Sequence, residues 1–122
     1  MTPLKAKILI ADDDLKVCES TQVVLHSAGF DTQIATGGAE AIEALNQENF
    51  TLALLDLSMP EVNGLSVLTH IRQYKINTGV IVVSGESNLD KALQVVKAGA
   101  RDYIRKPHSA EELILSINRV LE

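Results

Sequence analysis

Aromatic residues and cysteine are scarce in this sequence of 122 residues. It has no tryptophan, two tyrosines and two phenylalanines, yet 46% of its residues are hydrophobic, so aliphatic side chains must build the core. The single cysteine, Cys18, excludes an internal disulfide and is typical of a reducing compartment. No apolar run approaches the roughly 18 to 20 residues of a membrane span, and the start, MTPLKAK, lacks the apolar segment of a signal peptide. We therefore expect a cytoplasmic protein with no membrane partner.

Basic residues are also fewer than acidic ones. The chain carries 16 acidic and 11 basic residues, a net charge of −5 and an isoelectric point near 5.1. This balance disfavours attraction to the phosphates of a nucleic acid, so we expect no direct nucleic-acid partner. No repeat, low-complexity tract or flexible linker divides the chain, and its length is within the roughly 100 to 150 residues typical of one domain. We expect a single domain over residues 1–122.

Short β-branched runs alternate along the chain with segments of helical spacing, the pattern typical of βαβ units. The pattern predicts strands at residues 7–11, 32–35, 52–56, 80–84 and 102–104. It predicts helices at residues 15–28, 38–46, 64–74 and 89–98, and a last helix that runs to the end of the chain. Strands 52–56 and 80–84 are apolar at consecutive positions, as expected when helices cover both faces of a parallel sheet. The fold class is therefore α/β, a three-layer α/β/α sandwich.

Capping signals mark three of the helix starts. Asp14 is placed to cap the first helix, and Ser109 with Glu112 forms a capping box before the last. Ser87 with Asp90 is a looser form of the same signal before the fourth helix. We expect these residues to fix where the helices begin.

Polar side chains lie at or just beyond the carboxyl ends of four of the predicted strands. Asp12 and Asp13 follow the first, Asp56 ends the third, Ser84 ends the fourth and Lys106 comes just after the fifth. Because the carboxyl ends of parallel strands form one edge of the sheet, these residues are expected to meet there. Clustered carboxylates favour a cation, and hard oxygen ligands in a small site suit Mg²⁺. A lysine with a hydroxyl is suited to hold a phosphoryl group.

Taken singly, these residues have plainer interpretations. Asp13 and Asp14 are equally well explained as a solvated loop residue and a helix cap. Ser84 alone is an ordinary hydroxyl at a strand end, and an isolated lysine such as Lys106 is usually solvated. The combination carries the functional prediction.

That combination resembles, over essentially the whole chain, the receiver domain of two-component response regulators. The matching segments are ILIADDD at 8–14, LLDLSMPEVNG at 54–64, VVSGES at 82–87 and AGARDYIRKP at 98–107. The resemblance implies a flavodoxin-like (βα)₅ fold with a five-stranded parallel sheet in the order 2-1-3-4-5. It also implies a phosphoacceptor signalling switch that assists its own phosphorylation and dephosphorylation and is not an enzyme.

The resemblance assigns roles to individual residues. Asp56 is similar to the phosphoacceptor, and Mg²⁺ is implied as cofactor, held by Asp56, Asp13, the backbone carbonyl of Ser58, and Asp12 acting through water. Lys106 is similar to the lysine that contacts the phosphoryl oxygens.

Two further residues resemble the switch of the family. Ser84 matches the switch hydroxyl and Tyr103 the switch aromatic, and a cis peptide bond is implied before Pro107. Phosphorylation is then expected to alter the face made by the fourth helix, the last strand and the last helix. The implied partner is a sensor histidine kinase or a phosphotransfer protein. The resemblance is also compatible with an output domain beyond Glu122 and with homodimer formation on phosphorylation.

Two other classes of α/β protein fit the sequence less well. Asp12 and Asp14 match the D-x-D of haloacid-dehalogenase-like phosphatases, as nucleophile and general acid, but Lys16 stands where that family has Thr or Val. The short chain also leaves little room for a substrate-selecting cap. A flavin-binding flavodoxin is disfavoured because no loop rich in Gly, Ser and Thr follows the first strand, and four aromatic residues leave few to stack on a flavin.

Overall fold

The computed structural model describes residues 6–85 and 88–122, in which strands and helices alternate. In chain order they are β1 (Lys7–Ala11), α1 (Leu15–Ser27), β2 (Asp31–Ala35), α2 (Gly38–Gln47), β3 (Leu52–Leu55), α3 (Gly64–Gln73), β4 (Gly79–Ser84), α4 (Leu89–Lys97), β5 (Asp102–Arg105) and α5 (Ala110–Leu121). Every predicted strand is present, and the predicted ends of strands and helices lie within one residue of those observed. β3 ends at Leu55, so Asp56 is the first residue beyond the strand.

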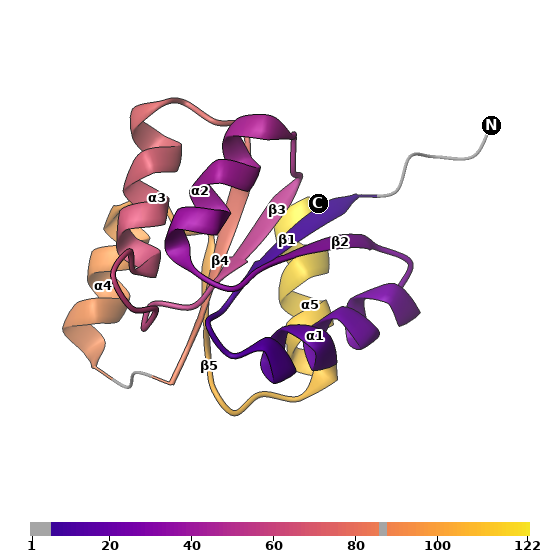
Figure 1. The fold of residues 1–122 in the computed structure, drawn as a ribbon. Coiled ribbons are helices and arrows are strands. Elements are labelled where there is room, and N and C mark those ends of the chain that lie inside the picture. The colour runs from indigo at the N-terminus through magenta and orange to yellow at the C-terminus, as the bar shows by residue number, and fades with distance from the viewer. Residues whose placement is uncertain (1–5, 86–87) are drawn as a thin grey trace.

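The five strands form one parallel sheet in the order β2-β1-β3-β4-β5, which confirms the order that the resemblance implied. Two helices, α1 and α5, cover one face, and α2, α3 and α4 cover the other (Figure 1). The apolar core is correspondingly split in two. One half contains Leu25 of α1 and Ile117 of α5, and the other contains Leu45 of α2, Leu68 of α3 and Val95 of α4. The predicted three-layer α/β/α sandwich is confirmed.

The helix starts follow the predicted capping residues with one exception. Asp14 accepts hydrogen bonds from the first-turn N–H groups of α1, and the capping box of Ser109 and Glu112 is present at α5. At α4 the prediction was wrong, because the cap is Asn88, whose side-chain oxygen accepts the N–H of Asp90. Asparagine is as strong a cap as serine and lies one residue nearer the helix. Ser87 lies outside the described residues. Among the helices described, none has the length and apolar character needed to cross a membrane.

Candidate functional site

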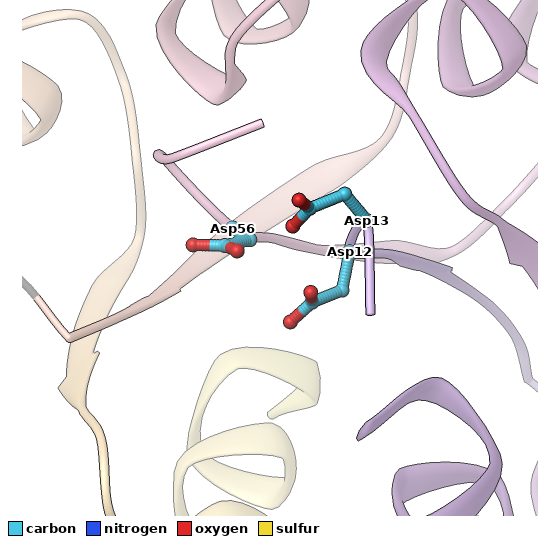
Figure 2. Close-up of side chains that lie close together, drawn as sticks. All are labelled: Asp12, Asp13 and Asp56. Atoms are coloured by element: carbon cyan, nitrogen blue, oxygen red, sulfur yellow. The ribbon is translucent and has the colours of Figure 1, made fainter. Parts of the chain in front are cut away.

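Three carboxylates meet where β1 and β3 end. These strands are neighbours with Ala11 opposite Leu55, so the next residue of each lies at the same level. The backbone N–H of Asp56 also donates to the Ala11 carbonyl over 2.9 Å, which ties the two strand ends together. One oxygen from each of Asp12, Asp13 and Asp56 lies within 4.8 Å of the others, and Figure 2 shows the three side chains gathered at this edge. Sequence reasoning predicted this convergence.

The three consecutive aspartates play three different structural roles. Asp12 is buried, with 5% of its surface exposed, and it accepts the Asp14 backbone N–H at 2.9 Å and the Lys106 ammonium at 2.7 Å. Asp13 is exposed and belongs to the carboxylate cluster. Asp14 caps α1 through bonds from the N–H groups of Lys16 and Val17. The plainer interpretation was therefore right for Asp14.

The environment of Asp56 disfavours a negative charge. The residue is 7% exposed, and this burial raises the pKa of its carboxyl above the ordinary value. A hydrogen bond from the Ser58 N–H to Oδ1, at 3.2 Å, and the charge of Lys106 lower the pKa, while Asp12 and Asp13 raise it. The net pKa shift is upward. A buried carboxylate beside two others is a site that gains from a cation.

Lys106 lies between two of the carboxylates. Its Nζ is 2.7 Å from Oδ2 of Asp12 and 3.6 Å from Oδ2 of Asp56. Burial alone would lower the pKa of the ammonium, but the hydrogen bond with Asp12 and the charges of Asp56 and Asp12 outweigh it, so the pKa is raised. The lysine therefore stays charged at neutral pH. Its backbone N–H donates to the Ser84 carbonyl at 2.7 Å, and the bond to Pro107 is cis, as the resemblance implied.

The two residues that resemble a switch lie on adjacent strands. Ser84 ends β4 and is fully buried, and it is paired in register with Arg105 of β5. Tyr103 is half-buried and packs against the core on the side of α2, α3 and α4. Tyr103 therefore lies on the face of the sheet that α4 covers. Glu86, which also belongs to the VVSGES segment, lies outside the described residues.

Sequence reasoning missed two features of the site. It assigned Asp12 only to the metal, whereas the structure pairs Asp12 directly with Lys106. It also gave Gly64 no role beyond the start of the third helix, but a Cβ atom there would lie 2.3 Å from the carbonyl oxygen of Asp56. Glycine is therefore required where α3 begins against the Asp56 peptide. The Asn63-Gly64 pair was the available signal for this close approach.

The donor set fits a divalent cation. All three clustered side chains are carboxylates, the hard oxygen ligands that Mg²⁺ prefers, and Asp13 keeps one side of the cluster open to water. One lysine balances only one of the three negative charges. Among residues 6–85 and 88–122, Asp12, Asp13 and Asp56 are the one group of acidic, histidine or cysteine side chains whose ligand atoms lie close enough together to hold a metal ion.

Comparison with known proteins identifies the family. The model of the response regulator receiver domain matches residues 8–118. The chain belongs to the response regulator receiver family. The solved receiver domain of the Francisella response regulator 1452 is 34% identical to this receiver, with a TM-score of 0.90 over 95% of this chain and 96% of that one. The acidic cluster of Asp12, Asp13 and Asp56 is typical of the Mg²⁺ site of receivers.

Curated relatives of this receiver are longer proteins. The cell cycle transcriptional regulator CtrA of Caulobacter vibrioides is 32% identical over 115 residues, which are 94% of this chain and 50% of CtrA. The transcriptional regulatory protein ZraR of Klebsiella oxytoca is 31% identical over 121 residues, or 99% of this chain and 27% of ZraR. The chain thus spans about half the length of CtrA and about a quarter of ZraR.

The phosphatase alternative is not supported. The family match is to receivers, and Asp14, which that alternative needs as general acid, is engaged in capping α1.

Proposed function

We propose that this receiver is a phosphoacceptor switch in which Asp56 takes a phosphoryl group from a phosphohistidine. The donor is a sensor histidine kinase or a phosphotransfer protein, the partners with which receivers of this family interact. One observation carries the proposal: a buried carboxylate, Asp56, shares one sheet edge with two further carboxylates and a charged lysine. We place the reaction in the cytoplasm. The chemistry occurs once on the protein's own side chain, so the chain acts as a signalling protein and not as an enzyme.

The residues of the site have distinct tasks in this reaction. A carboxylate oxygen of Asp56 bonds to phosphorus, the bond from phosphorus to the imidazole nitrogen breaks, and its electron pair stays on the nitrogen. The Ser58 N–H holds Oδ1 of Asp56 and so orients the carboxylate. Lys106, 3.6 Å from Oδ2, is placed to pair with the oxygens of the incoming group.

Mg²⁺ would be held by Asp12, Asp13, Asp56 and the backbone carbonyl of Ser58. When bound, it neutralises the charge that gathers on the acidic cluster and the phosphoryl group. Asp12 also holds Lys106 through its 2.7 Å ion pair, so the same residue serves the metal and the lysine.

The switch is proposed to run from Ser84 to Tyr103. The Ser84 hydroxyl is buried at the end of β4, next to the strand that carries Tyr103. A bond from this hydroxyl to the phosphoryl group favours an inward Tyr103 ring and a changed surface over α4, β5 and α5. That surface would act on an output domain beyond Glu122 or on a second copy of the chain. Within this surface, α4 contributes three exposed apolar side chains, Leu89, Leu93 and Val96.

The first test is stoichiometric labelling. Incubation with acetyl phosphate and Mg²⁺ should add one phosphoryl group, seen by intact-protein mass spectrometry, and Asp56→Asn should abolish it. Asp31→Asn, at the exposed start of β2, is the matched control and should label like the parent. An adduct that persists in Asp56→Asn would rule out this phosphoacceptor.

The second test separates the switch from the chemistry. Ser84→Ala should still accept a phosphoryl group at Asp56. Its chemical shifts over α4, β5 and α5 should respond to beryllofluoride by roughly half or less of the parent response, because the differential contact is lost. Ser66→Ala, at an exposed site in α3, should respond fully. A full response in Ser84→Ala would mean that another residue carries the coupling.

A further inference from the structure

Gly38, the first residue of α2, lies against the loop of residues 57–63, which leads from Asp56 to α3. A Cβ atom on Gly38 would lie 2.0 Å from the carbonyl oxygen of Val62 and 2.7 Å from its carbonyl carbon. Real Cβ contacts below 3.0 Å essentially never occur. The Cβ would also lie 2.7 Å from Cγ1 of Val62. Because the two carbonyl atoms belong to the backbone, a change of the Val62 rotamer alone cannot relieve the contact. The observed approach of α2 to this loop therefore requires glycine.

The preceding residue provides an internal comparison. Gly37 has φ −174°, an extended conformation open to any residue, and a Cβ built on it would meet nothing within 4 Å. Two adjacent glycines thus differ completely in what they permit. Glycine is required at position 38 by the Val62 backbone, while no contact requires it at position 37.

The α2 helix cannot easily retreat from the loop. Ala41, Ala44 and Leu45 of α2 are buried in the half of the core that also holds Val67 and Leu68 of α3. Moving the helix outward would open this packing, and close-packed cores resist such shifts. A methyl group at position 38 would therefore displace the loop.

The two ends of the loop are held together beside the phosphoacceptor. Gly64 sits against the Asp56 carbonyl, and the Gly64 N–H donates to the Leu57 carbonyl at 3.3 Å. Between these anchors lies Ser58, whose N–H binds Oδ1 of Asp56. A shift at Val62 is thus transmitted along a short backbone segment to the residue that orients Asp56.

We propose that Gly38 is a positioning residue for the phosphoacceptor loop. Its missing side chain sets how closely α2 approaches Val62, and this approach holds Ser58 and Asp56 in the arrangement that binds Mg²⁺ and accepts a phosphoryl group. The inference rests on the proposed function, since it concerns the metal and acceptor geometry of that same site. Gly38 acts through Val62 and does not itself touch the carboxylates.

The test compares Gly38→Ala with Gly37→Ala. In Gly38→Ala, the Mg²⁺ dissociation constant, from NMR titration with the metal alone, should rise about tenfold or more, since displacements near 1 Å have large effects on such sites. Labelling by acetyl phosphate should be slow at low Mg²⁺ and recover at high Mg²⁺. Gly37→Ala should keep the Mg²⁺ dissociation constant within about twofold of the parent value. A Gly38→Ala protein that loses stability but binds Mg²⁺ like the parent would overturn the proposal.

A measurement on the parent protein covers the case in which Gly38→Ala does not fold. Coupling between two sites is reciprocal, so Mg²⁺ binding should shift the amide resonances of Gly38 and Val62 with the same midpoint as those of Ser58. Amides at positions 38 and 62 that stay unmoved at saturation would overturn the inference. A parent that binds Mg²⁺ with these shifts but is never labelled would instead contradict the proposed function and leave the positioning role intact.

Discussion

Both ends of the β1 strand bring a lysine and a carboxylate together, with opposite consequences. Just beyond its carboxyl end, Asp12 pairs with Lys106, and Asp56 lies 3.6 Å from the same ammonium. At its amino end, Lys7 pairs with Glu48, and both side chains are well exposed, at 36% and 43%. Each end pairs a lysine with an acidic side chain. The two ends differ in burial and in the number of carboxylates.

Burial and the number of carboxylates determine how strongly the charges interact at each end. At the amino end, water and salt screen the pair, so the attraction between the two charges is weak. At the carboxyl end three carboxylates face one lysine, and the charged form of Asp56 is disfavoured by burial and by its acidic neighbours. This excess negative charge lowers the stability of the fold and creates the demand for a cation. The end of the sheet that holds the proposed phosphoacceptor is therefore the electrostatically strained one.

The largest expected effect is on the metal at the carboxyl end. Asp13 is exposed and belongs to the carboxylate cluster, so Asp13→Asn removes one of the few ligands proposed for Mg²⁺. The Mg²⁺ concentration for half-maximal labelling by acetyl phosphate should rise by about tenfold or more. Asp14→Asn is the matched control, because asparagine caps a helix as well as aspartate does. Equal Mg²⁺ dependence in the two variants would refute the choice of Asp13 as ligand.

An intermediate effect is expected on stability when the buried charge is removed. The pKa of Asp56 is raised in the folded protein, so the folded state holds this proton more tightly than the unfolded state does. Its contribution to stability therefore falls as pH rises from the ordinary value of 3.8 through the folded pKa. At neutral pH without Mg²⁺, Asp56→Asn should raise the free energy of unfolding by about 1 kcal/mol, the usual size of a stabilising substitution.

Urea unfolding from pH 4 to 8 measures this difference. The advantage of Asp56→Asn should grow with pH until Asp56 is fully ionised in the folded parent, and it should shrink when Mg²⁺ stabilises the parent. Glu48→Gln, which removes an exposed carboxylate at the other end of the sheet, should show no such gain. A parent as stable as Asp56→Asn at neutral pH without Mg²⁺ would contradict the electrostatic strain assigned to this end.

Local patterns in the sequence predicted most of the fold. Apolar runs and helical spacing predicted the ends of the strands and helices within one residue, because these patterns depend on short segments of the chain. The convergence of Asp12, Asp13, Asp56 and Lys106 followed from the geometry of parallel sheets. The strand order did not follow from the pattern and came from the family resemblance.

Features that depend on side-chain geometry or on contacts between distant segments were not predictable. The pairing of Asp12 with Lys106 joins residues 94 positions apart and depends on side-chain conformations that no local pattern sets. The contact of Gly38 with Val62 depends on how closely a helix approaches a loop. At α4, Ser87 and Asn88 are both competent caps by residue type, so residue type alone does not predict that Asn88 is the cap.

The smallest effect is expected at the exposed end of the sheet. Lys7→Met keeps the apolar stem of the side chain and removes the pair with Glu48 and the contact of the ammonium with the Phe50 ring, 5.4 Å from its centroid. Because both partners are exposed, the loss in unfolding free energy should be about 0.5 kcal/mol or less, and it should vanish in 1 M salt. Labelling at Asp56 and its Mg²⁺ dependence should be unchanged. A loss well above 1 kcal/mol that persists in high salt would show that the amino end also holds a strongly coupled charge, and the contrast between the two ends would fail.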